Sequence, residues 1–102
     1  MAFRKVAERK DVRPGTGKAV EVGGRTIALW NVGGTFHAID DECTHVGGPL
    51  SEGELDGTTV RCPWHGAEFD VTTGKVLCPP AGTSLACYKV QIVGEDVQID
   101  VP

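Results

Sequence analysis

Cys43-Thr44-His45 and Cys62-Pro63-Trp64-His65 are the two segments that decide how this 102-residue chain folds. Sixteen residues separate His45 from Cys62, and both segments lie in runs poor in helix-favouring residues. Each segment offers one thiolate and one imidazole. Two Cys and two His side chains, divided evenly between two loops, predict a metal site.

The combination of ligands within each loop indicates which metal the site would bind. A single tetrahedral zinc ion could use the same four side chains, but zinc fingers usually place two Cys on one turn and two His on another. Here each loop carries a mixed pair, C-x-H in the first and C-x-x-H in the second. Mixed pairs suit a two-iron cluster in which one iron takes both thiolates and the other both imidazoles. A zinc-binding interaction module with no redox role remains the alternative.

The complete pattern C-x-H-x₁₆-C-x-x-H, with Gly47, Gly48, Pro63 and Gly66 around it, resembles the signature of the Rieske [2Fe–2S] proteins. The resemblance extends over nearly the whole chain. It implies an all-β fold of three stacked antiparallel β-sheets, with one [2Fe–2S] cluster per chain at one tip. The implied cofactor and metal ligands are Cys43 and Cys62 on the inner iron, and His45 and His65 on the outer iron.

Two positions indicate the branch of the family. High-potential Rieske proteins carry a further Cys in each loop and form a disulfide there, whereas this chain has Gly48 and Trp64. The sequence therefore resembles the low-potential ferredoxins of bacterial aromatic-ring oxygenase systems. This resemblance implies a monomeric electron carrier, not itself an enzyme. It would dock transiently with an NAD(P)H-dependent flavoprotein reductase and a terminal aromatic-ring-hydroxylating oxygenase. The alternative is a small electron-transfer subunit of a reductase complex such as nitrite reductase.

Length and composition agree with a small β protein. A chain of 102 residues supports a single domain, 1–102, and fourteen Gly with six Pro favour short strands and turns. We expect a cluster-binding subdomain at about 40–82, inserted into a base built from both ends of the chain.

The net charge of −4 argues against nucleic acid as a partner. Because no long apolar run occurs and residues 1–5 do not resemble a signal peptide, we expect no membrane span and a soluble, cytoplasmic protein.

Glycine-centred turns predict the strand order. Gly23-Gly24 and Gly33-Gly34 predict a three-stranded meander, preceded by a first strand at 3–7 and a chain break at Gly17. Asp56-Gly57 predicts a second hairpin, following a strand at 51–55. A closing hairpin is expected from strands 85–93 and 97–101 around residues 94–96, each with one buried face. Both ligand loops are expected at the tips of adjacent hairpins.

Two further groups of side chains lie outside the ligand pattern. Cys78 and Cys87 are not needed by the ligand pattern, and we interpret them as small buried thiols. Acidic side chains flank the first ligand loop, where they either steer a basic partner or are simply solvated. These are Asp40, Asp41, Glu42, Glu52, Glu54 and Asp56.

Overall fold

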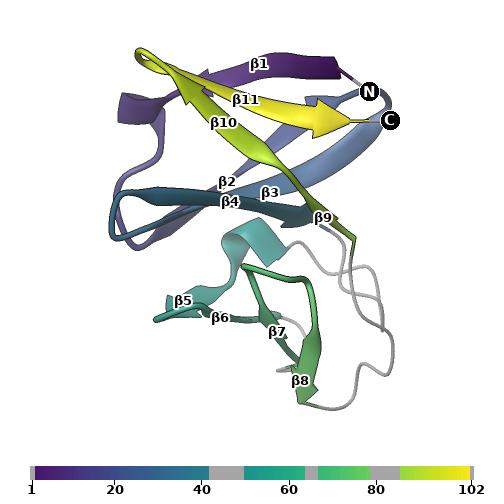
Figure 1. The fold of residues 1–102 in the computed structure, drawn as a ribbon. Helices are drawn as coiled ribbons and strands as arrows, with labels where there is room; N and C mark the ends of the chain where they lie inside the picture. The colour runs from purple at the N-terminus through teal and green to yellow at the C-terminus, as the bar shows by residue number, and fades with distance from the viewer. Residues whose placement is uncertain (1, 42–49, 64–66, 79–85, 102) are drawn as a thin grey trace.

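The computed structural model describes residues 2–41, 50–63, 67–78 and 86–101, and its strands form three antiparallel sheets (Figure 1). The first sheet has the order β1 (Ala2–Glu8), β11 (Asp96–Val101), β10 (Val90–Val93). The second has the order β2 (Thr16–Val22), β3 (Arg25–Val32), β4 (Thr35–Asp40), β9 (Cys87–Tyr88). The third consists of β5 (Glu54–Asp56), β6 (Thr59–Arg61), β7 (Glu68–Asp70) and β8 (Val76–Cys78). Two short 3₁₀ helices, η1 (Arg9–Asp11) and η2 (Leu50–Glu52), complete the described elements. The prediction of an all-β fold with three antiparallel sheets is confirmed.

Strand β3 is buried on both faces, and this places the second sheet between the other two. Ile27 and Leu29 on one side and Ala28 and Trp30 on the other are each at most 1% exposed. Because successive side chains of a strand point to opposite faces, β3 contributes to two separate hydrophobic cores. No helix in the described part of the chain is long and apolar enough to cross a membrane.

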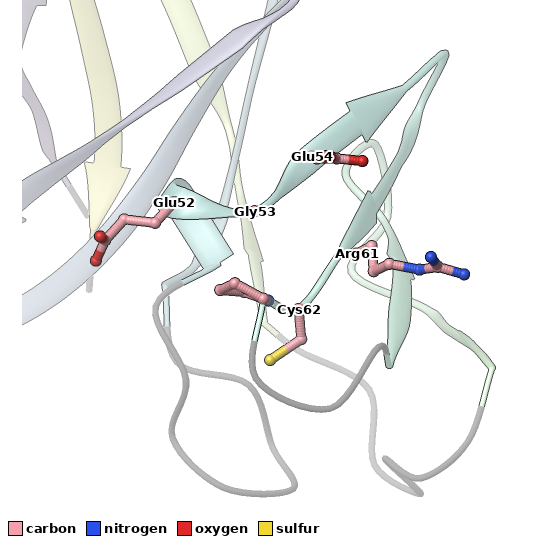
Figure 2. A pocket seen from close by; sticks show the side chains of 6 residues that line it. Glu52, Gly53, Glu54, Arg61 and Cys62 are labelled. Carbon is pink, nitrogen blue, oxygen red and sulfur yellow. The ribbon is translucent and has the colours of Figure 1, made fainter.

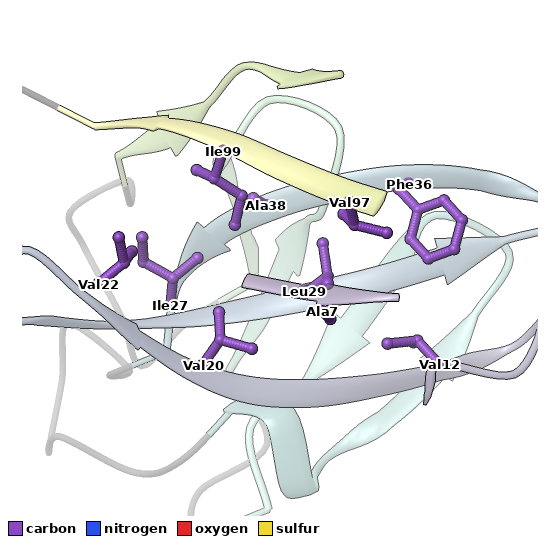
Figure 3. Close-up of a cluster of buried hydrophobic side chains, with 10 residues drawn as sticks. All are labelled: Ala7, Val12, Val20, Val22, Ile27, Leu29, Phe36, Ala38, Val97 and Ile99. Atoms are coloured by element: carbon purple, nitrogen blue, oxygen red, sulfur yellow. The ribbon is translucent and has the colours of Figure 1, made fainter. Parts of the chain in front are cut away.

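The base core lies between the first and second sheets (Figure 3). Its members are Ala7, Val12, Val20, Val22, Ile27, Leu29, Phe36, Ala38, Val97 and Ile99. The site core lies on the opposite face of the second sheet, toward the third sheet. Its members are Ala28, Trp30, Ile39, Leu50, Val60, Cys62, Ala67, Phe69 and Val71. The third sheet is thus attached to the base through apolar packing on β3 and β4.

The predicted meander is confirmed as β2–β3–β4. Gly23 and Gly24 have φ values of 59° and 78°, and Gly33 and Gly34 of 59° and 98°. Two successive residues with positive φ are typical of the type I′ turns that match the twist of a hairpin. The hairpin predicted at Asp56-Gly57 exists, but its turn residues are Gly57 and Thr58, because Asp56 pairs with Thr59. The strand expected at 51–55 is wrong in its first half, since residues 50–52 form η2.

The chain break predicted at Gly17 is wrong. Gly17 lies within β2 and is paired with Trp30 on β3. A Cβ atom at this position would lie 2.6 Å from the nearest carbons of the Trp30 ring. Glycine is therefore used here to give space to a buried indole, not to turn the chain.

The closing hairpin differs from the prediction in two respects. The run expected as one strand is divided at Lys89 into β9, which pairs with β4, and β10, which pairs with β11. On β11 the predicted buried face is confirmed by Val97 and Ile99, both 0% exposed. On β10 it holds in part: Val90 is partly buried and packs against the base core, whereas Ile92, farther along this edge strand, is 41% exposed.

Two isoleucines test the importance of β3. Ile27→Ala should lower the free energy of unfolding by about 2–5 kcal/mol, because it leaves a cavity in the base core. Ile92→Ala, which removes the same atoms from the exposed edge strand, should cost only about 0.5 kcal/mol. Denaturant unfolding of both variants provides the measurement, and equal losses would contradict the central role of β3.

Candidate metal centre

Of the four predicted ligands, Cys62 lies within the described residues. Cys43, His45 and His65 lie outside them, as do Gly47, Gly48, Trp64 and Gly66 of the predicted motif. No group of three or more His, Cys, Asp or Glu side chains is placed to hold a metal within the described ranges. The structure therefore defines the surroundings of one ligand and the chain segments from which the others extend.

Cys62 directly follows β6 and is 1% exposed, as part of the site core. Its backbone N–H donates to the carbonyl oxygen of Ala67 over 2.7 Å, which closes the connection between β6 and β7. The prediction that the second ligand loop lies at a hairpin tip is thus confirmed. Among the described residues the thiol has no disulfide partner. A buried thiolate is costly unless a cation neutralises it, so a sulfur here fits the inner, desolvated side of a metal cluster.

Asp41 fixes the chain on both sides of residues 42–49. Its carboxylate Oδ1 accepts the backbone N–H of Ser51 over 2.7 Å, and its carbonyl oxygen accepts the N–H of Leu50 over 2.7 Å. Its own N–H donates to the carbonyl of Thr26 over 3.1 Å. Asp41 is only 6% exposed, so its interpretation as a solvated or steering charge is wrong.

The first ligand loop does not lie at a hairpin tip as predicted. It connects β4 of the second sheet to η2, and β4 does not pair with β5. The reason is that Leu50, 0% exposed, is drawn into the site core and begins a 3₁₀ turn in place of a strand.

Gly53 brings the end of η2 into contact with the strand that leads to Cys62. A Cβ atom at Gly53 would clash with the backbone carbonyl oxygen of Arg61, so only glycine fits without displacing the backbone. The Gly53 N–H donates to the carbonyl of Leu50 over 2.8 Å. The segments that carry the two ligand pairs are thereby held together at their bases. Sequence reasoning missed both Asp41 and Gly53, because their roles depend on partners in other elements.

A polar hollow of about 420 Å³ borders Cys62 (Figure 2). Its lining consists of Glu52, Gly53, Glu54, Arg61, Cys62 and Pro63. Arg61 Nη2 lies 3.3 Å from Glu68 Oε2, so its charge is already paired. Glu52 and Glu54 are exposed, and among the described residues neither forms a salt bridge. The surface beside Cys62 is therefore acidic.

The structure tests the prediction of a buried thiol for Cys87 but not for Cys78. Cys87 is exposed, so its interpretation as a buried thiol is wrong. It lies on β9, a two-residue strand at the edge of the second sheet. Cys78 is the last residue of β8, and its side chain is outside the described part of the structure.

Comparison with known proteins gives a consistent picture. Residues 2–89 match the Rieske [2Fe-2S] domain family. The 3-phenylpropionate/cinnamic acid dioxygenase ferredoxin subunit of Shigella boydii serotype 4 (strain Sb227) is 52% identical over 77 residues, covering 74% of this chain and 73% of that protein. The solved structure of the Sphingomonas yanoikuyae B1 ferredoxin has a TM-score of 0.93 at 32% identity, covering 99% of this chain and 100% of that one.

A third similarity concerns an assembly. A chain in the complex of reduced oxygenase and oxidized ferredoxin in carbazole 1,9a-dioxygenase has a TM-score of 0.89 at 38% identity, covering 95% of this chain and 91% of that one. Together with the buried thiol at the end of β6, these findings define the class of the protein. The chain belongs to the Rieske [2Fe-2S] domain family, which implies a [2Fe–2S] cluster as its cofactor.

Gly53→Ala tests the contact between the two ligand-bearing segments. We expect it to destabilise the fold by about 1–3 kcal/mol, since backbone atoms of Arg61 must move, and to lower the iron content of the purified protein. Gly57→Ala, at the turn of the same hairpin, is the control. It places alanine at a position with positive φ, which costs about 1–2 kcal/mol, but its added methyl group would contact no other atom. Iron analysis beside thermal melting distinguishes them: similar iron content in both variants would contradict the proposed contact.

Proposed function

We propose that this protein is a Rieske-type ferredoxin, a one-electron carrier that itself catalyses no reaction. It accepts electrons from an NAD(P)H-dependent flavoprotein reductase and delivers them to a terminal aromatic-ring-hydroxylating oxygenase. The observation that carries the proposal is the 52% identity to a dioxygenase ferredoxin subunit over three quarters of the chain. The similarity to a chain from a ferredoxin–oxygenase complex supports the oxygenase as the electron acceptor.

The cofactor in this proposal is one [2Fe–2S] cluster per chain, held by Cys43, His45, Cys62 and His65. When bound, such a cluster takes up and releases a single electron. The burial of Cys62 supports an arrangement in which the two thiolates lie on the inner, dry side and the two imidazoles on the outer side. Neutral imidazoles in place of two thiolates make the cluster less negative and raise its potential above that of all-Cys clusters.

The proposed organisation is a single domain, 1–102, with the cluster-binding subdomain at about 40–82. In support, β5 to β8 form a sheet of their own within this range, and β1 pairs with β11 at the opposite side of the molecule (Figure 1). A carrier must release its partners, so we assign it a monomeric state and a small docking surface at the cluster end. The exposed free thiol of Cys87 and the use of NAD(P)H as electron source support a cytoplasmic location.

Substituting the ligands tests the cofactor assignment. Cys62→Ala should abolish the visible absorption of the cluster and remove the two irons and two sulfides found per chain in the wild-type protein. The same result is expected for substitution of Cys43, His45 or His65. Cys87→Ser, which alters an exposed thiol outside the motif, should retain all three. One zinc per chain in the wild-type protein, without visible absorption, would favour the zinc-binding alternative.

Reconstitution tests the electron-transfer function. With NAD(P)H, a flavoprotein ferredoxin reductase and a Rieske oxygenase, addition of this protein should raise product formation from an aromatic substrate at least about tenfold over the mixture without it. Such a dependence is expected because specific protein docking determines electron delivery at low carrier concentration. Co-purification in a fixed complex with a reductase subunit, and no stimulation of any oxygenase, would contradict the proposal and favour the reductase-subunit alternative.

A further inference from the structure

Arg25, Asp40 and Tyr88 form a hydrogen-bonded corner where β3, β4 and β9 meet. The hydroxyl of Tyr88 donates to Oδ1 of Asp40 over 2.5 Å. Nη1 of Arg25 donates to the hydroxyl oxygen of Tyr88 over 3.2 Å. The hydroxyl thus accepts a hydrogen bond from a guanidinium and donates one to a carboxylate. Both hydrogen bonds are charge-assisted and hold the phenol in one orientation.

The backbone at the same corner also contacts the residues that directly follow two other segments. The Asp40 N–H donates to the carbonyl of Ala86 over 3.1 Å, directly after residues 79–85. The next residue, Asp41, accepts the N–H groups of Leu50 and Ser51, directly after residues 42–49. The end of β4 is thus the point at which the chain before the first ligand pair, the chain after it and the chain after 79–85 are joined.

The backbone ladder alone gives this junction little support on the β9 side. β4 and β9 share two register pairs, Ala38 with Tyr88 and Ile39 with Cys87, whereas β3 and β4 share six. A ladder this short contributes few hydrogen bonds. The backbone hydrogen bond from Asp40 to Ala86 continues this ladder by one residue, and the bond from Tyr88 to Asp40 adds a side-chain link at the same strand end.

The surroundings of Tyr88 preserve this bond. Its ring is partly buried and packs against the base core. Burial first, and then the hydrogen bond to Asp40, raise the pKa of Tyr88 above its ordinary value of 10.0. The hydroxyl therefore keeps its proton and remains a donor to Asp40.

We propose that Tyr88 is a positioning residue for the metal centre. Through Asp40 it fixes the strand end from which the first ligand segment leaves, against the strand that follows residues 79–85. The inference rests on the proposed function, which places the ligands Cys43 and His45 three and five residues after Asp40. Tyr88 itself does not contact the cluster in this proposal.

Holoprotein variants test the role of the corner. Tyr88→Phe keeps the packed ring and removes the donor, Asp40→Ala removes the acceptor, and Asp40→Asn keeps an acceptor oxygen. Tyr88→Phe and Asp40→Ala should each speed the loss of cluster absorbance in excess iron chelator about tenfold, the factor expected for one lost charge-assisted hydrogen bond. They should also broaden the electron paramagnetic resonance lines of the reduced cluster. Asp40→Asn should stay close to wild type.

The double variant and a remote control complete the experiment. Tyr88→Phe combined with Asp40→Ala should lose its cluster no faster than either single variant, because both remove the same bond. Gln91→Ala removes a 2.7 Å bond to Gln98 in the first sheet and should leave cluster loss unchanged. A lower melting temperature in Tyr88→Phe with wild-type cluster loss and line widths would overturn the positioning role. Multiplicative effects in the double variant would also overturn it. A wild-type protein without any [2Fe–2S] cluster would overturn both this inference and the proposed function.

Discussion

Burial of β3 on both faces is the constraint on which the rest of the structure depends. A strand that alternates between two cores must be covered from both sides, and in this chain the two covers have different origins. One cover is the first sheet, in which β1 and β11 bring the two ends of the chain together. The other is the third sheet, formed by a continuous stretch from β5 to β8. The run Ile27-Ala28-Leu29-Trp30 therefore both organises the base and carries the cluster end.

Local signals in the sequence were sufficient for most of the fold. The Gly-Gly pairs predicted the meander because a type I′ turn needs positive φ at both central residues, a requirement that two adjacent glycines meet. Alternation predicted the buried face of β11 correctly. The motif Cys43-x-His45…Cys62-x-x-His65 predicted the family, which the match over residues 2–89 confirms. The assignment of individual ligands stays a prediction, supported at Cys62 by its burial.

What the sequence could not reveal depends on contacts between distant elements. Gly17 reads as a chain break until the ring of Trp30 is placed beside it, and Gly53 lies in an apparent strand until the carbonyl of Arg61 approaches. Asp41 looks like one of several surface acids, yet it is buried and holds the chain on both sides of residues 42–49. Ile92 alternates as a buried residue should, but its strand is at a sheet edge. In each case the local pattern was ambiguous and the partner was remote.

The presence of Cys62 in the site core has a consequence for how folding and cofactor binding are related. The same apolar residues that attach the third sheet to β3 also surround the sulfur that the proposed cluster would use. A thiolate in such surroundings is unfavourable until a metal ion neutralises it, so cluster binding and packing of the third sheet should reinforce each other. The described residues of the base core include none of the predicted ligands and come from both ends of the chain. Loss of the cluster should therefore weaken the third sheet first, while the first and second sheets keep their own packing.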